Sequence, residues 1–136
     1  MEETRISFEE YGMNMALEAS KRSEDPYRKV GAVAFDHENR IVATAYNGTK
    51  SGFVTPDGFW DDRDLRQKYM LHAEANLCSH FKRGDVKTAF VTTLPCTSCI
   101  QTLVAHGVEE IFYKEDYPKS ESKEVAKTYG ISLKKL

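Results

Sequence analysis

Residues 88–113 read TAFVTTLPCTSCIQTLVAHGVEEIFY, and this stretch decides the fold. The β-branched and aromatic residues of 88–94 predict a strand. Apolar side chains at helical spacing predict a helix over 96–106 that ends at Gly107, and 108–113 again has the composition of a strand. Two strands joined through a helix form a parallel pair with a right-handed crossover. This segment therefore predicts an α/β protein.

The same patterns place the remaining elements on either side of this unit. Before it, they predict a helix over 7–21 with Ser7 and Glu10 as a capping box, and a hairpin over 30–46. A long loop with a few helical turns follows over 47–71, and then a helix over 73–82 that Arg83-Gly84 stops. After it, they predict a helix over 120–129 and a last short strand over 131–133. The predicted fold class is a three-layer α/β/α sandwich around a mixed five-stranded sheet. We expect residues 1–136 to form a single domain.

Composition excludes several classes of protein. Nineteen Lys and Arg against 21 Asp and Glu give a net charge of -2, without the basic excess that binding to nucleic-acid polymers requires. The acidic N-terminus lacks the pattern of a secretory signal, and no apolar run approaches the roughly 20 residues that span a bilayer. Three cysteines are too few for a disulfide framework and are expected to be reduced thiols or metal ligands. We therefore expect a cytoplasmic protein with no membrane or nucleic-acid-polymer partner.

Two short segments carry the chemistry: His72-Ala73-Glu74 and Pro95-Cys96-Thr97-Ser98-Cys99. A Cys-x-x-Cys pair that opens a helix places both sulfurs on its first turn, where exposed N–H groups stabilise thiolates. One His and two Cys leave the fourth position of a tetrahedral Zn²⁺ for water, which distinguishes a catalytic zinc from a closed structural one. The predicted ligands are His72, Cys96 and Cys99. Glu74 is the predicted acid/base that shuttles the proton of the water.

Each segment taken alone has a blander interpretation. Cys-x-x-Cys also occurs in redox pairs and structural zinc sites, and His-x-Glu is common by chance. The combination H-x-E followed by P-C-x-x-C is, however, the known signature of zinc-dependent nucleobase deaminases. A decayed enzyme or a structural zinc site is the alternative. We assign no chemistry to five further residues: Cys78, His37, His80, His106 and Trp60.

Between Ser20 and about Leu133 the chain resembles the deoxycytidylate (dCMP) deaminases of the cytidine deaminase superfamily. The resemblance rests on the zinc segments and on Lys29-Val30-Gly31-Ala32-Val33, Ala45-Tyr46-Asn47-Gly48, Val91-Thr92-Thr93-Leu94-Pro95-Cys96 and the strand Gly107–Tyr113 followed by Tyr117. The tRNA adenosine deaminases usually carry Asp-Pro-Thr-Ala before His-Ala-Glu, whereas this chain has Tyr69-Met70-Leu71 there.

This resemblance implies zinc-dependent hydrolysis of dCMP to dUMP and ammonia, which supplies thymidylate synthesis, with no organic cofactor. It implies that Asn47 binds the deoxyribose, that Ala73 presents backbone to the pyrimidine and that Tyr117 approaches the 5'-phosphate. Arg28 is the candidate cation for this phosphate, and a solvated charge beside Lys29 is the equal alternative.

The resemblance also implies regulation and assembly. Many dCMP deaminases are hexamers that are activated by dCTP and inhibited by dTTP, and Mg²⁺ would accompany such a triphosphate effector. The corresponding loop here contains Gly48, Lys50, Ser51 and Gly52, with Lys50 near the place of a familiar proline, and Arg83 matches a position close to the subunit interface. Three other functions stay open: a deaminase of free cytidine or deoxycytidine, a deaminase of tRNA adenosine, and a non-catalytic zinc-stabilised nucleotide-binding subunit.

Overall fold

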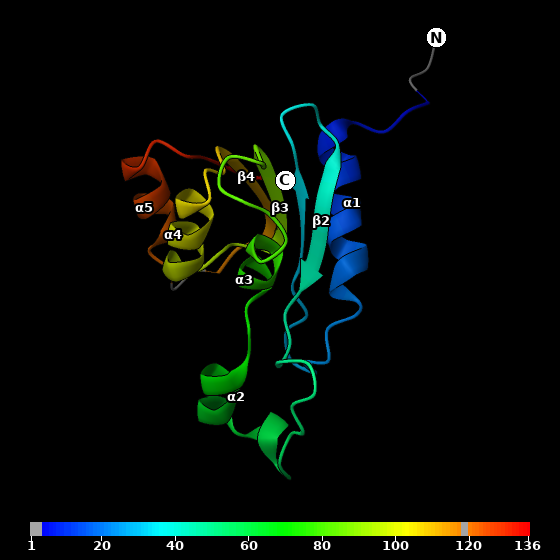
Figure 1. Ribbon diagram of the computed structural model, residues 1–136, viewed down its shortest axis with the longest axis vertical. Helices are drawn as coiled ribbons and strands as arrows, with labels where there is room; N and C mark the ends of the chain where they lie inside the picture. Colours follow the sequence, from blue (N-terminus) through cyan, green and yellow to red (C-terminus); the bar gives the residue numbers. More distant parts are fainter. Residues whose placement is uncertain (1–3, 118–119) are drawn as a thin grey trace.

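A mixed sheet runs through the middle of the computed structural model, which describes residues 4–117 and 120–136 (Figure 1). Its five strands lie in the order β2-β1-β3-β4-β5. β1 pairs antiparallel with β2 and β3, while β3, β4 and β5 are parallel neighbours. The bounds are Gly31–Phe35 for β1, Ile41–Tyr46 for β2, Thr88–Thr93 for β3, Glu110–Glu115 for β4 and Ser132–Lys135 for β5. The predicted mixed five-stranded sheet and its two parallel crossovers are confirmed.

Helices cover both faces of this sheet. Helix α1 (Phe8–Ser20) packs on one face over a cluster built around Phe35 and Phe90, and the Ser7 hydroxyl caps it by accepting the N–H of Glu10 at 3.1 Å. The other face carries α3 (Ala73–Cys78), α4 (Thr97–Ala105) and α5 (Ser122–Thr128) over a second apolar cluster. Figure 1 shows α1 on one side of the strands and α3, α4 and α5 on the other. The three-layer α/β/α sandwich is therefore also confirmed.

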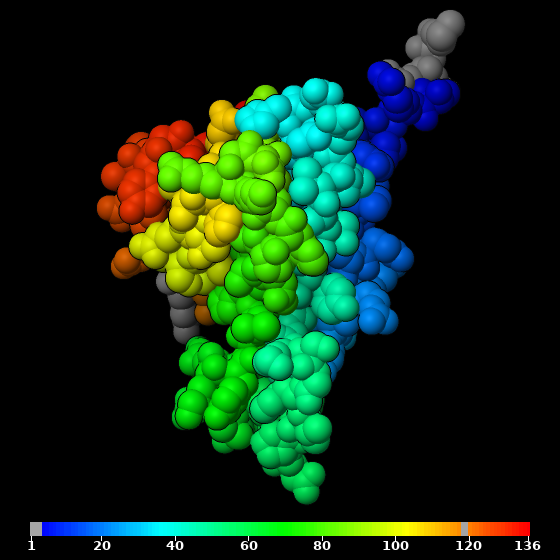
Figure 2. All heavy atoms as spheres, viewed as in Figure 1, coloured from blue at the N-terminus to red at the C-terminus, as the bar shows by residue number. Residues whose placement is uncertain are grey.

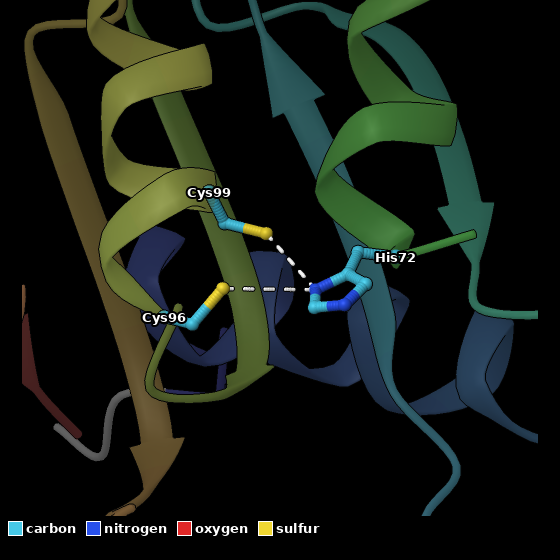
Figure 3. Close-up of side chains that lie close together, drawn as sticks. All are labelled: His72, Cys96 and Cys99. Atoms are coloured by element: carbon cyan, nitrogen blue, oxygen red, sulfur yellow. Dashed lines mark hydrogen bonds between the residues drawn. The ribbon is translucent and has the colours of Figure 1, made fainter. Parts of the chain in front are cut away.

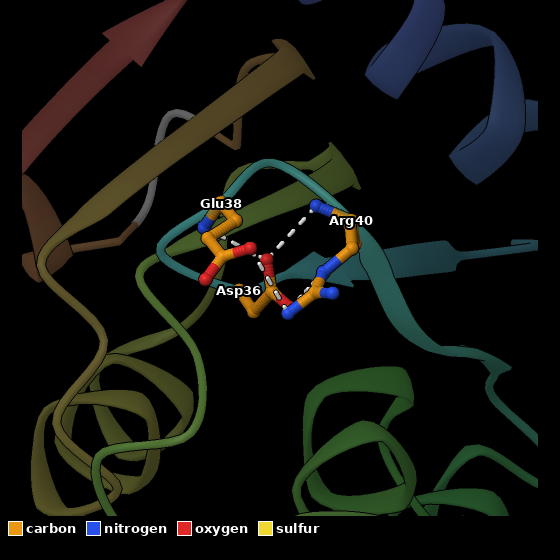
Figure 4. Close-up of polar contacts among 3 residues, drawn as sticks. All are labelled: Asp36, Glu38 and Arg40. Carbon is orange, nitrogen blue, oxygen red and sulfur yellow. Dashed lines mark hydrogen bonds and ion pairs between the residues drawn. The ribbon is translucent and has the colours of Figure 1, made fainter.

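A network of hydrogen bonds around one carboxylate stabilises the turn between β1 and β2 (Figure 4). Asp36 accepts the backbone N–H groups of Glu38 and Arg40, each at 2.9 Å, and also the Nε–H of Arg40 at 3.1 Å. Asn39 takes the left-handed conformation, with φ of 62°, that closes the turn. The hydrogen bonds lower the pKa of Asp36, and they hold the turn of the predicted hairpin together.

Helix α1 lies unusually close to β1, and glycine makes the approach possible. A Cβ atom on Gly31 would lie 2.0 Å from the carbonyl oxygen of Ala16 and 2.5 Å from the backbone nitrogen of Ser20. No side chain fits between these two stretches of backbone. The chain segment before β1 is therefore held tightly against the end of α1.

The predicted long loop forms a small projecting lobe, which we call the 48–71 lobe (Figure 2). It contains the 3-10 helix η1 (Phe59–Asp61) and helix α2 (Arg63–Tyr69). Gly48 and Leu71 close its base by exchanging two backbone hydrogen bonds, of 3.1 and 2.7 Å. Aromatic contacts within the lobe, including a stacked pair with ring centroids 5.4 Å apart, provide its packing. The lobe is thus built locally on a narrow neck.

The helix predicted over 73–82 is shorter than expected. Helix α3 ends at Cys78, because the Ser79 hydroxyl donates to the carbonyl of Asn76 at 2.6 Å and His80 bonds to Leu77 in a tighter turn. Arg83 therefore does not stand at a helix terminus as predicted. Among the described residues, no helix is long and apolar enough to cross a bilayer.

Candidate active site

Two short helix starts bring together the three predicted metal ligands. His72 is the N-cap of α3 and Cys96 is the N-cap of α4, and both residues have extended backbone. Neither side chain caps its own helix, so both are free to face each other across the gap between the helices. Cys99 lies one turn into α4 and points the same way (Figure 3). The sequence folds so that an imidazole and two thiols converge on one point.

The distances within this triad fit a tetrahedral zinc ion. Nδ1 of His72 lies 3.2 Å from Sγ of Cys99 and 3.7 Å from Sγ of Cys96. Zn–S and Zn–N bonds of about 2.3 and 2.0 Å place a nitrogen and a sulfur ligand roughly 3.6 Å apart around a tetrahedral ion. All three ligand atoms lie within 4.8 Å of one another, and they form the one such metal-binding group found among the described residues. The donor set and its spacing fit Zn²⁺.

The two cysteines differ strongly in acidity. Hydrogen bonds from Cys99 and His72 lower the pKa of Cys96 to about 3, so that this sulfur is a thiolate. The hydrogen bond to the Cys96 thiolate, together with burial, raises the pKa of Cys99. The hydrogen bond to Cys96 also raises the pKa of His72. A pre-formed thiolate beside an imidazole is an electrostatic environment that a divalent cation stabilises further.

Glu74 lies beside the triad without joining it. Its side chain is buried, at 4% exposed, and burial raises its pKa to about 7. The carboxylate oxygens stay outside the metal-binding group. A carboxyl group that exchanges its proton near neutral pH, next to a metal site, is suited to acid/base chemistry.

A pocket of about 550 Å³ opens onto these residues. His72, Glu74 and Cys96 line it. All four predicted substrate-binding residues line it too: Arg28, Asn47, Ala73 and Tyr117. Arg28 stacks its guanidinium over the ring of Tyr117, with 4.7 Å to the centroid, and among the described residues it forms no ion pair. The structure thus brings the two candidate phosphate residues into contact with each other.

Asn47 makes contacts that sequence reasoning did not anticipate. Its side-chain oxygen accepts the N–H of Val30 at 2.9 Å, and its amide nitrogen donates to the carbonyl of Arg28 at 3.0 Å. The amide therefore links to the backbone on both sides of Lys29 and holds the loop before β1 against the start of the lobe. Any contact with deoxyribose would be made in addition to these two bonds.

Two arginines of the pocket were not predicted from the sequence. Arg63 and Arg66 of α2 line the same pocket, although the chain around them carries no recognisable motif. Their regular spacing on a helix next to His72 is the one signal that could have suggested them. Three arginines therefore line a single pocket.

The predicted regulatory residues lie elsewhere. Gly48 is buried at the neck of the lobe, whereas Lys50, Ser51 and Gly52 are exposed at its start, and none of the four lines the pocket. Arg83 lies in the turn after α3, with its side chain near Gly107. Cys78, to which no chemistry is assigned, is a buried free thiol whose pKa is raised to about 11, mainly by burial.

Residues 6–115 match the family model described as the cytidine and deoxycytidylate deaminase zinc-binding region. The chain belongs to this family. Curated deoxycytidylate deaminases from mouse and human are each 30% identical, over 96% and 82% of this chain and 80% and 66% of their own lengths. A yeast deoxycytidylate deaminase is 33% identical over 97% of this chain. The match covers 46% of the length of the yeast protein.

Solved deaminase structures share the fold. A dCMP deaminase from the cyanophage S-TIM5, in complex with dCMP and dUMP, superposes with a TM-score of 0.82 at 25% identity, covering 98% of this chain and 100% of the phage chain. A cytidine deaminase from Mycobacterium tuberculosis gives a TM-score of 0.55 at 21% identity, over 84% and 87% of the two chains. The phage enzyme thus matches over 98% of the chain.

Proposed function

We propose that this chain is a single-domain, zinc-dependent dCMP deaminase that hydrolyses dCMP to dUMP and ammonia and so supplies thymidylate synthesis. One observation carries the proposal: a buried carboxyl group, Glu74, stands beside a His/Cys/Cys triad at a pocket that is also lined by Arg28 and Tyr117. The curated deoxycytidylate deaminases and the phage enzyme with bound dCMP and dUMP support this substrate over others.

The residues divide the reaction between them. His72, Cys96 and Cys99 would hold Zn²⁺, which would supply an activated water molecule as the nucleophile for C4 of the pyrimidine. Glu74 would accept the first proton of this water and pass it to ring N3. It would then accept the second proton, from the hydroxyl group on C4, and pass it to the amino group that leaves as ammonia. Ala73 is buried and lines the pocket, and by the resemblance its backbone would face the pyrimidine.

Charge in the pocket favours a nucleotide over a nucleoside. The stacked guanidinium of Arg28 provides a cation for the 5'-phosphate, whereas cytidine or deoxycytidine would leave it without an anionic partner. The energetic cost of burying Glu74 argues against a purely structural zinc subunit, because a structural site needs no carboxyl group there.

The decisive experiment follows the ultraviolet absorbance of dCMP, CMP, cytidine and deoxycytidine with the zinc-loaded protein. We expect rapid turnover of dCMP that a chelator abolishes and that added Zn²⁺ restores. Arg28→Ala should slow dCMP turnover and leave deoxycytidine turnover unchanged. Preferred turnover of a nucleoside, or no turnover of any of the four, would contradict the proposal.

We extend the proposal to regulation and assembly on the resemblance alone. Gly48, Lys50, Ser51, Gly52 and Arg83 would act in a homo-oligomer, a hexamer in many relatives, that dCTP with Mg²⁺ activates and dTTP inhibits. Rate curves against dCMP with each effector, together with the mass of the assembly in solution, test this part. Identical curves with and without both triphosphates would eliminate it. The three free cysteines are the support for a cytoplasmic location.

A further inference from the structure

The pocket carries an excess of cationic side chains that its own carboxylates do not neutralise. Arg28, Arg63 and Arg66 all line it, and among the described residues none of the three forms an ion pair. Asp25, the acidic residue beside them, accepts the backbone N–H groups of Tyr27 and Arg28 at 2.8 and 3.1 Å. Both bonds use one oxygen, Oδ1, which shapes the loop. The unpaired guanidinium groups indicate an anionic ligand.

Arg66 is held in place as firmly as Arg28. Its guanidinium lies over the ring of Tyr27, with 4.6 Å to the centroid, and donates one N–H to the carbonyl of Trp60. The hydroxyl of Tyr27 in turn donates to the carboxylate of Asp61 at 3.0 Å. These contacts tie the 48–71 lobe to the loop that carries Arg28.

The two stacked arginines share one arrangement. Each guanidinium carbon lies over the ring of a tyrosine, Arg28 over Tyr117 at 4.7 Å and Arg66 over Tyr27 at 4.6 Å from the centroid. A guanidinium over an aromatic face keeps N–H groups that can donate to an anion. An arginine that is fixed in this way loses less side-chain entropy when it binds a phosphate in a bidentate manner.

We infer that Arg66, with Arg63 beside it on α2, binds the 5'-phosphate of the substrate from the side of the 48–71 lobe, and so helps this enzyme to select nucleotides over nucleosides. The inference rests on the proposed dCMP deaminase function. The ligand chemistry is a dianionic phosphate monoester, which two or three guanidinium groups match in charge and in geometry. Arg66 would otherwise be a structural staple that only packs the lobe.

The test compares substrates with and without the phosphate. We expect Arg66→Gln to lower kcat/KM for dCMP by roughly 10- to 100-fold, with the loss mainly in KM, and to leave deoxycytidine nearly unchanged. Arg63→Gln should cause a smaller loss of the same kind. Lys68→Gln is the matched control, because it removes a cation from the same helix at a position that does not line the pocket.

Binding of products gives a second readout that needs no turnover. Calorimetry with dUMP and with deoxyuridine should show that Arg66→Gln weakens the binding of dUMP alone. An equal loss of kcat/KM for dCMP and deoxycytidine, or an unchanged preference for dCMP, would overturn the inference and leave Arg66 with only a packing role in the lobe. If Arg66→Gln does not fold, Arg66→Lys keeps the charge, and it must still reduce the dCMP preference several-fold because it loses the bidentate fork. Failure of the proposed function itself would appear separately, as wild-type protein that does not deaminate dCMP.

Discussion

Replacing Glu74 by Gln should make the metal-free protein more stable at alkaline pH while it abolishes most of the activity. Burial raises the pKa of this carboxyl group from 4.5 to about 7, so folding favours its protonated form. Below pH 4.5 the group is protonated in both states and its ionisation has no effect on stability. Above pH 7 it is ionised in both states, and burying the charge costs about 3 kcal/mol of unfolding free energy.

The measurement is the difference in unfolding free energy between Glu74→Gln and wild type, from urea denaturation of chelated samples at several pH values. Gln keeps the shape of the side chain and carries no charge at any of these pH values. We expect the ionisation of Glu74 to shift the difference in favour of the variant by about 2.5 kcal/mol between pH 5 and pH 8. The charge of Glu74 also raises the pKa of His72 and of Cys99, so the titration of these two groups contributes to the measured difference as well.

The same variant loaded with zinc should lose roughly 10²- to 10⁴-fold in kcat for dCMP, the usual contribution of a general acid/base. Zinc content measured in parallel shows that the loss is not a loss of metal. A stability difference that does not change with pH would refute the reasoning from burial. A zinc-loaded variant with full activity would refute the acid/base role.

Three further changes test other parts of the structure. Cys96→Ala should abolish stoichiometric zinc binding by atomic absorption, and Cys78→Ala, which removes a buried thiol outside the site, should retain it. Gly31→Ala should destabilise the protein by about 1–3 kcal/mol or more in urea denaturation, because α1 must move away from β1, and an unchanged midpoint would contradict the observed close approach. Glu24→Ala should lower Tm at pH 7, since hydrogen bonds from Thr49 lower the pKa of this carboxylate. The loss of Tm should shrink as the pH falls through that lowered pKa, and a Tm difference that is equal at pH 7 and pH 3 would speak against it.

The zinc half of the site could be predicted from the sequence because its chemistry is local. His72 and Cys96 each stand at a helix start, and the spacing of two or three residues to Glu74 and Cys99 follows from one helical turn. The parallel strands before and after α4, β3 and β4, then fix at which end of the strands the sulfurs lie. Short-range pattern and fold topology together were sufficient.

The remainder depended on long-range geometry that the sequence does not encode in a local pattern. The end of α3 was predicted four residues too late, because Ser79 and the packing of Phe81 override a helix-permissive sequence. The two contacts of Asn47 with the loop before β1 span 17 and 19 residues. The arginines of α2 reach the pocket because of the path of the lobe, which no motif marks.

Chemistry and selectivity therefore lie on parts of the molecule with different mechanical support. The zinc ligands and Glu74 stand on helices that pack directly on the sheet, where close packing fixes their positions to the precision that catalysis needs. The lobe with Arg63 and Arg66 joins the body at the Gly48–Leu71 pair and through the contacts of Tyr27. A phosphate tolerates small displacements of its cationic partners far better than a reacting carbon tolerates displacement of its nucleophile. Substitutions in the lobe should thus change substrate preference with little effect on the rate of the chemical step, whereas substitutions at the two helix starts should affect all substrates alike.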